Sequence, residues 1–261
     1  MPERDELRRA GREVRSRLGL GDEQGAELAP GLTDLTDELV FGSVWSRPGL
    51  ELEDRMVATL SALTCKQYVP QLHRFIGAAL HIGMSPRLVQ EVLLHCGMYA
   101  GMPSAASSLR VVSEVLDQLD IPHPVDVLSP AAEVDEVDLE RLYARGLETM
   151  NVLHDERARD GYAAPDSAAA DLYDTAIHYL YGEIWNRSGI TTRQRMICSV
   201  ASFTALQMEG QQRKFFRSAL NVGLAPTEVI EVIAQTAPYS GFPPALNALT
   251  VAESVLGAGS G

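Results

Sequence analysis

The sequence has 261 residues, of which 46% are hydrophobic and 22% charged, a composition typical of a folded globular protein. Its 35 acidic residues exceed its 22 basic residues, and the resulting formal net charge of −13 opposes binding to nucleic-acid phosphates. No apolar run approaches the roughly 18–20 residues of a membrane span, and the charged N-terminus lacks the apolar core of a signal peptide. We therefore expect a cytoplasmic protein that binds neither nucleic acid nor membranes.

The first predicted elements are helices. A charged leading helix is expected over about residues 4–19. Apolar residues recur every three or four positions through 51–66, and a similar stripe over 68–83 ends at Gly83. This spacing predicts two consecutive amphipathic helices.

Two further helices follow. Ser85 and Pro86 supply an N-cap and a first-turn proline for a helix that ends near Tyr99. A Gly-Met-Pro sequence breaks this helix, and the next one runs from about Pro103 to about Leu119. Because no convincing strand alternation occurs, the sequence predicts an all-α fold.

These elements belong to a unit that occurs twice at an offset of 140 residues. FGSVWSRPGL (41–50) returns as YGEIWNRSGI (181–190), GAALHIGMSPRLVQEV (77–92) as RSALNVGLAPTEVIEV (217–232), and YAGMPSA (99–105) as YSGFPPA (239–245). A constant offset over matching segments is typical of tandem duplication. We predict a first repeat with its leading helix over 1–125, a linker over 126–137, and a second repeat with its leading helix over 138–261.

The motifs WSRPGL and YAGMPSA, with a helix pair between them, resemble the carboxymuconolactone decarboxylase family, relatives of the AhpD alkylhydroperoxidases. The resemblance covers about residues 36–119 and 168–256. It implies two tandem AhpD-like helical repeats packed as a pseudo-dimer. Single-repeat members of the family form hexameric rings, so the resemblance also implies a homo-oligomer, a trimer of two-repeat chains.

Peroxidase chemistry on this fold requires a CxxC pair. The matching positions hold other residues in both repeats: Tyr68, Gln71, Met208 and Gln211. Without a thiolate and a resolving thiol there is no peroxidatic cycle, so we expect no peroxidase activity. The three cysteines form neither a CxxC pair nor a metal-ligand cluster, and we expect reduced thiols at Cys65, Cys96 and Cys198. No metal and no cofactor are expected.

The decarboxylase branch of the family places a glutamate and a histidine four residues apart on one helix. Those positions are Gln71 and Phe75 here, and Gln211 and Phe215 in the second repeat. Decarboxylation of a lactone acid leaves a dienolate, which needs a hydrogen-bond donor near the carbonyl and a group that returns a proton to carbon. Glutamine and phenylalanine cannot shuttle protons, so the mechanism of the family does not transfer directly.

His95 is the strongest remaining catalytic candidate. It shares a helix face with Tyr99, so an imidazole acid–base and a phenol donor would lie side by side. The alternative is a histidine that packs in the core with its hydrogen bonds satisfied. The second repeat has Gln235 at the matching position. His73 is a weaker candidate, because it lies about 200° around the helix from Phe75.

Six residues are candidates for substrate binding: Trp45, Arg47, Gln67, Phe75, Gln211 and Arg187. Arg47 and Arg187 can clamp a substrate carboxylate through two hydrogen bonds. The favoured alternative is a structural role, in which these arginines fix the chain turn or pair with Glu183 or Asp54.

One face of the second helix in each repeat carries the same unusual set. Its members at i, i+4 and i+8 are Gln67, Gln71 and Phe75, repeated as Gln207, Gln211 and Phe215. Either they form a neutral polar pocket or they pack as an inherited set.

Three functional hypotheses follow. The first is a cofactor-free lyase acting on a small or medium organic acid or lactone, with a pocket near the boundary between repeats. Its proposed residues are His95 as acid–base, assisted by Gln71, Tyr99 and Arg47. The second is a cyclase, isomerase or dehydratase of a specialised biosynthetic pathway. The third is a non-catalytic scaffold or binding protein, which a pocket filled by Phe75 and Phe215 would support.

Overall fold

The computed structural model describes residues 3–21, 28–124, 138–159 and 168–257, and no strand occurs within these ranges. The first repeat contains α1 (Arg4–Arg17), α2 (Leu32–Thr36), the π-helical segment η1 (Asp37–Trp45), α3 (Leu52–Lys66), α4 (Val69–His81), α5 (Pro86–Ala100) and α6 (Met102–Gln118). The second repeat contains α8 (Leu139–His154), η3 (Asp155–Arg159), α9 (Ala170–Ala176), η5 (Ile177–Glu183), η6 (Ile184–Asn186), α10 (Thr192–Ala205), α11 (Glu209–Asn221), α12 (Pro226–Ser240) and α13 (Phe242–Leu256). The all-α fold with two tandem repeats is confirmed. The predicted linker over 126–137 lies outside the described residues.

Local sequence signals explain where these helices begin and end. The side chain of Ser85 accepts the backbone N–H of Leu88 at the start of α5. Gly83 adopts φ +93°, a conformation that ends α4 and that glycine adopts without strain. The sequence does not mark the helical stretch over 32–45, because polar and apolar residues are mixed on its faces: Asp37 is buried, whereas Leu32 and Leu35 are exposed.

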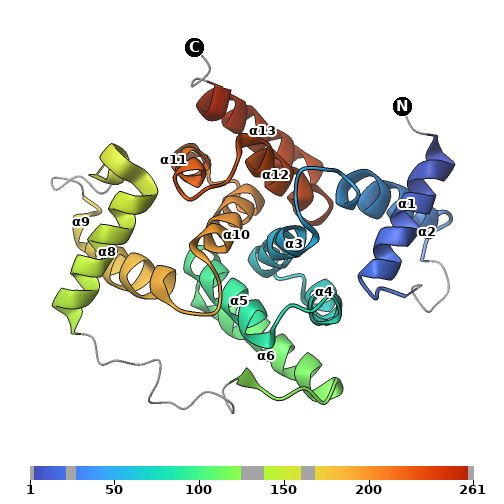
Figure 1. The fold of residues 1–261 in the computed structure, drawn as a ribbon, viewed down its shortest axis with the longest axis horizontal. Helices are drawn as coiled ribbons and strands as arrows, with labels where there is room; N and C mark the ends of the chain where they lie inside the picture. The colour runs from blue at the N-terminus through green and yellow to red at the C-terminus, as the bar shows by residue number, and fades with distance from the viewer. Residues whose placement is uncertain (1–2, 22–27, 125–137, 160–167, 258–261) are drawn as a thin grey trace.

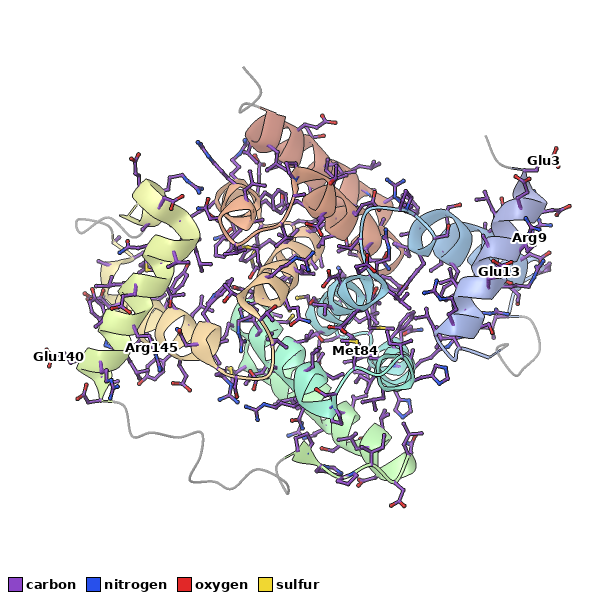
Figure 2. The ribbon with its side chains drawn as sticks, in the orientation of Figure 1. Glu3, Arg9, Glu13, Met84, Glu140 and Arg145 are labelled. Atoms are coloured by element: carbon purple, nitrogen blue, oxygen red, sulfur yellow. The ribbon has the colours of Figure 1, made fainter. Side chains whose placement is uncertain are left out.

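The leading helices pack closely against η1 and η5 through glycine. A Cβ on Gly11 would collide with the carbonyl oxygen of Asp37, and a Cβ on Gly146 would collide with that of Ile177. Figure 2 shows Glu3, Arg9 and Glu13 along α1, and all three are exposed. Aligned on the two glycines, the leading helices are offset by 135 residues, five fewer than the rest of the repeat.

The two repeats interlock at the centre of the molecule. Figure 1 shows α3 and α10 in the middle, with α1 and α8 at opposite ends. α3 contacts α10 and also α12, while α10 also contacts α5, so each repeat places one helix against the other repeat. The buried apolar residues of both repeats form one continuous cluster. Within the described ranges, no helix is long and apolar enough to cross a membrane.

Candidate functional site

Two predicted site residues on α5, His95 and Tyr99, lie at the boundary between the repeats and contact the second repeat. His95 Nε2 lies 3.2 Å from Ser199 Oγ and 3.2 Å from the Tyr99 hydroxyl, which itself lies 2.8 Å from Ser199 Oγ. The His95 ring meets the Trp185 ring edge to face, with centroids 5.0 Å apart. We call the cluster of His95, Tyr99, Trp185 and Ser199 the His95 site. Because Ser199 and Trp185 belong to the second repeat, both repeats build it.

The imidazole of His95 is fully buried, and its Nδ1 has no hydrogen-bond partner. Burial, assisted by the positive charge of Arg195, holds the pKa of His95 well below its usual value, so the ring is neutral near pH 7. Arg195 Nη1 is also buried without a hydrogen-bond partner. Trp185 Nε1 is likewise buried without a partner, so the His95 site contains two unmatched ring nitrogens, with the unmatched guanidinium nitrogen of Arg195 as a third such atom.

Tyr99 is a neutral phenol. Burial raises the pKa of its hydroxyl well above the usual value, and the hydrogen bond with Ser199 opposes this shift without cancelling it. Ser199 Oγ donates to the carbonyl oxygen of Arg195 at 2.9 Å, so we assign the Tyr99 proton to its bond with Ser199. His95 Nε2 then donates to these two hydroxyl oxygens. The phenol is thus held from two sides by groups that can exchange its proton.

Tyr99 also lies in the wall of a cavity of about 420 Å³. This volume falls in the range of about 300–1,000 Å³ that is typical of small-molecule sites. The wall is mostly apolar, its polar groups are phenols and an amide, and its members are Met98, Tyr99, Ala169, Leu172, Tyr173, Ala176, Leu180, Tyr181, Phe203, Met208, Gln211 and Phe215. No charged residue occurs among these described lining residues.

The matching place in the other half of the molecule is built differently. Gln235 accepts a hydrogen bond from Arg55 Nη1 at 3.0 Å and donates to Thr59 Oγ1 at 3.1 Å. Trp45 Nε1 donates to the Tyr239 hydroxyl at 2.7 Å. We call the cluster of Trp45, Thr59, Gln235 and Tyr239 the Gln235 site.

Phe75 packs tightly against the Gln235 site. Its ring stacks on Trp45 with centroids 6.0 Å apart and meets Tyr239 edge to face at 5.3 Å. In the other half, Phe215 instead packs on Phe203 and His154, each at 4.8 Å. Leu63 stands in the first repeat where the second has Phe203, so the aromatic partner that draws Phe215 aside is absent from the first repeat.

The predicted carboxylate clamps are engaged in ion pairs. Arg47 binds Glu231 through two nitrogens, the shorter contact being 2.6 Å, and Arg187 binds Glu91 in the same way at 2.8 Å. Arg187 also lies 3.8 Å from Glu183, one of the two predicted partners, whereas the other, Asp54, pairs with Arg193 at 2.6 Å. Burial alone would raise the pKa of Glu231, but its arginine partners outweigh burial and lower it. Both arginines cross-link the repeats through buried carboxylates.

The remaining predicted residues lie away from His95. Gln71 is exposed on α4. The amide of Gln67 donates to the carbonyl oxygens of Thr64 and Ser104, at 2.7 and 3.2 Å, and so joins the end of α3 to α6. The structure therefore separates Gln67 and Gln71 from His95, and of the paired glutamines it is Gln211 that lines the cavity with Tyr99.

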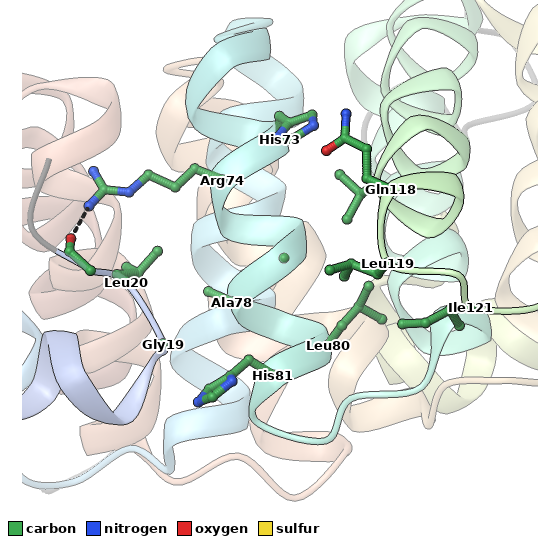
Figure 3. A pocket seen from close by; sticks show the side chains of 13 residues that line it. Gly19, Leu20, His73, Arg74, Ala78, Leu80, His81, Gln118, Leu119 and Ile121 are labelled. Atoms are coloured by element: carbon green, nitrogen blue, oxygen red, sulfur yellow. Dashed lines mark hydrogen bonds between the residues drawn. The ribbon is translucent and has the colours of Figure 1, made fainter. Parts of the chain in front are cut away.

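His73 lines a second, larger hollow of about 880 Å³ between α4, the segment after α1 and the end of α6. Figure 3 shows His73 and His81 on α4, with Gln118 across from His73 and Arg74 directed to the carbonyl oxygen of Gly21, which lies 3.5 Å away. This hollow contains neither His95 nor Tyr99. We therefore centre the candidate site on the smaller cavity.

Sequence reasoning missed several residues of the cavity region. Ser199, Phe203, Tyr181 and His154 are all at or next to its wall, yet none was selected. Comparison of the two repeats could have identified Tyr181, because it replaces Phe41 of the first repeat and thus adds a hydroxyl at a buried position. The pairing across repeats could not be read from one repeat at a time.

In the described parts of the chain, no group of three or more histidine, cysteine, aspartate or glutamate residues is placed so that it could hold a metal ion. Cys65, Cys96 and Cys198 are free thiols. Although the three thiols are far apart in the sequence, they lie together in the fold, because Cys96 interacts with both of the others.

Comparison with known proteins agrees with this architecture. The sequence profile of the carboxymuconolactone decarboxylase family matches residues 30–114 and 170–254. The 4-carboxymuconolactone decarboxylase of Acinetobacter baylyi is 30% identical over 125 residues, which cover 45% of this chain and 92% of that protein. The nitrosuccinic acid decarboxylase of Metarhizium robertsii is 27% identical over 86 residues, or 33% of this chain and 60% of that protein.

A solved structure extends the likeness to the whole chain. The crystal structure of a proposed gamma-carboxymuconolactone decarboxylase subunit from Burkholderia xenovorans LB400 aligns with a TM-score of 0.54. The alignment covers 99% of both chains at 18% sequence identity. At this identity the likeness shows the fold alone, and it includes both repeats.

Proposed function

Because the chain belongs to the carboxymuconolactone decarboxylase family, we propose that it is a cofactor-independent, decarboxylase-type lyase acting on a small or medium organic acid or lactone. One observation carries the proposal. The phenol of Tyr99, bonded to the buried His95 and to Ser199, lies in the wall of a mostly apolar cavity of about 420 Å³. The relatives named above as decarboxylases support this class of reaction.

The apolar wall suits the first step of a decarboxylation. An anionic carboxylate is poorly solvated there, whereas the departing carbon dioxide is neutral. When the bond to the carboxylate carbon breaks, its electron pair moves into the conjugated carbonyl group and leaves an enolate oxygen. A hydrogen bond donated to that oxygen stabilises the transition state.

Tyr99 is the group that we assign to this oxygen. Its proton can turn from Ser199 to the substrate, while the N–H of His95 Nε2 holds the phenol oxygen in place. The proton returned to carbon then comes from Tyr99. His95 and Ser199 pass a replacement proton to the phenol, and the cluster regains the one proton consumed in each turnover from solvent water. Gln211 offers a further neutral contact in the cavity wall, the role first expected of Gln71.

The test is an assay of purified protein with 4-carboxymuconolactone and with nitrosuccinate, following loss of the acid and release of carbon dioxide. We expect turnover of at least one acid, and a loss of about 10²-fold in the variant His95→Gln, because general acid–base groups contribute about that much. A His95→Gln variant that stays within a few-fold of the wild type would remove His95 from the assignment. Carbon dioxide release from neither acid would count against the decarboxylase.

The neutral wall also favours a second candidate, a cyclase, isomerase or dehydratase of a specialised biosynthetic pathway. Tyr99, Tyr173 and Gln211 can polarise an uncharged substrate without a carboxylate clamp. Consumption of an acid without release of carbon dioxide would support this alternative. A non-catalytic scaffold is favoured by the packing of Phe75 in the Gln235 site but opposed by the open cavity beside Phe215.

We further propose that the protein is a cytoplasmic homotrimer, as its likeness to single-repeat relatives implies. Light scattering on the purified protein should then give the mass of three 28.4 kDa chains. A mass of one chain would contradict the trimer.

A further inference from the structure

A second chain of polar groups reaches the same cavity from the second repeat. The Tyr181 hydroxyl on η5 lies 3.2 Å from Nε2 of His154, the last residue of α8. His154 Nδ1 lies 2.8 Å from Ser218 Oγ on α11. His154 is fully buried and Tyr181, 3% exposed, belongs to the cavity wall. The chain of hydrogen bonds therefore runs from Ser218 through His154 to a phenol at the cavity.

The direction of these hydrogen bonds follows from their partners. Ser218 Oγ donates to the Lys214 carbonyl oxygen at 2.9 Å and accepts from Arg157 Nη2 at 3.2 Å. Its remaining capacity is as an acceptor, which places a proton on His154 Nδ1. Burial, together with the charges of Lys214 and Arg157, lowers the pKa of His154 to about 3, so the ring is neutral and its Nε2 is an acceptor. Tyr181 therefore donates its proton to His154.

The first repeat shows that the fold does not require this chain. It has apolar or small residues at the matching positions: Phe41 for Tyr181, Ala78 for Ser218 and Gly19 for His154. Buried polar groups cost free energy unless they are paired, and a packing role is already filled by phenylalanine and alanine in the sister repeat. The polar set occurs in the repeat whose cavity is open.

We propose that Tyr181 contacts the substrate as a hydrogen-bond acceptor. His154 and Ser218 are positioning residues, because His154, oriented by Ser218, binds the Tyr181 proton and leaves the phenol oxygen to accept from the substrate. This inference rests on the proposed function, because it assigns the cavity to a substrate. It narrows the substrate class to organic acids that carry a hydroxyl or another hydrogen-bond donor besides the group held by Tyr99. Phenols that differ in the direction of their hydrogen bonds, Tyr99 as donor and Tyr181 as acceptor, would then orient the acid.

Two measurements test the proposal, and neither needs turnover. The first is the tautomer of His154, read from its ¹⁵N chemical shifts, with His154→Leu used to assign the signals. We expect a neutral ring with the proton on Nδ1. A proton on Nε2 would make Tyr181 a donor to the substrate and would overturn the proposal.

The second measurement is binding of 4-hydroxybenzoate and 4-methoxybenzoate, followed by isothermal titration. We expect the hydroxy acid to bind about tenfold more tightly, because its hydroxyl can donate to Tyr181 and the methoxy group cannot, and we expect Tyr181→Phe to abolish the preference. Ser218→Ala should reduce it, while Ala78→Ser in the first repeat should leave it unchanged. Equal affinities in the wild type, or no binding of either acid, would overturn the proposal. Failure of the decarboxylation assays with this preference intact would overturn the proposed reaction instead.

Discussion

The His95 site and the Gln235 site occupy matching places in the two halves of one duplicated chain, yet their polar groups are balanced differently. Gln235 satisfies both of its neighbours, because it accepts from Arg55 and donates to Thr59. His95 leaves its own Nδ1 and a guanidinium nitrogen of Arg195 without partners. A buried unmatched group is a cost to stability, and such costs concentrate at functional sites.

The two sites also differ in how closely aromatic side chains pack around them, and again the Gln235 site is the more complete. Phe75 lies between Trp45 and Tyr239, whereas Phe215 packs on Phe203 and leaves an open cavity beside Tyr99. Aromatic side chains fill the space at the Gln235 site, whereas an open cavity of small-molecule size borders the His95 site. Both repeats contribute residues to each place, so the difference lies in a few side chains at two matching boundaries between the repeats.

The largest expected difference between the halves is in the response to loss of a buried carboxylate. Glu91→Gln removes the carboxylate that pairs with Arg87, Arg187 and Arg195. Arg187 keeps its contact with Glu183, but the buried Arg195 loses its anion, and Arg195 Nη1 already has no partner. Breaking a buried pair in this way costs about 3–5 kcal/mol. Glu231→Gln should cost about 1–2 kcal/mol less, because Arg55 keeps its bond to Gln235 and to backbone carbonyl oxygens. Urea denaturation of both variants measures the difference, and equal losses would contradict it.

The next largest effect is on catalysis. Tyr99→Phe removes the hydroxyl proposed to stabilise the enolate and should lower kcat by about 10²–10³-fold on an acid that the wild type turns over. Tyr239→Phe is the matched control. Because Phe75 packs against the Tyr239 ring, this variant should stay within about threefold of the wild type. Similar losses in the two variants would mean that both halves carry a site.

Much of the fold could be predicted because the signals were local or repeated. Ser85, Pro86 and Gly83 mark helix ends through their own backbone preferences, and the structure places α4 and α5 accordingly. The duplication could be read from a constant offset. The helix over 32–45 could not, because the buried Asp37 and the exposed Leu32 and Leu35 obscure its apolar face in the sequence.

The candidate site was predictable only in part. His95 and Tyr99 lie one turn apart on one helix, so their proximity follows from helix geometry. Ser199 and Trp185 come from the other repeat, and their contact with His95 depends on how the repeats interlock. Gln71 failed to join them for the same reason, since α4 of the first repeat faces the Gln235 site through Phe75.

A smaller effect should appear in the pH dependence of stability. His154 has a pKa of about 3 in the folded protein and an ordinary value of 6.5, so between these values the unfolded chain binds a proton that the folded chain does not. Stability therefore falls as pH falls through this window. From pH 6 to pH 4 this group should cost about 2 kcal/mol, a loss that His154→Leu should not show.

Urea denaturation at the two pH values measures this loss. Titration of the carboxylates is common to the wild type and the variant, so it cancels in their difference. The first repeat has Gly19 at the position that matches His154. The lowered pKa of His95 adds a loss of the same sign, but this loss is common to both proteins and also cancels in their difference. Parallel stability curves for the two proteins would show that His154 is protonated in the folded state.

The smallest expected effect exchanges the central residues of the two sites. In His95→Gln, a glutamine amide can accept from Arg195 and donate to Ser199, as Gln235 does with Arg55 and Thr59 in the other half. Satisfying a buried donor in this way should raise the free energy of unfolding by about 1 kcal/mol, although the variant loses its proposed activity. The reverse exchange, Gln235→His, should lower it by a similar amount without creating activity, because Phe75 still packs against the neighbouring Trp45. Thermal unfolding of both variants measures these changes, and a His95→Gln variant less stable than the wild type would mean that the histidine is kept for packing rather than for chemistry.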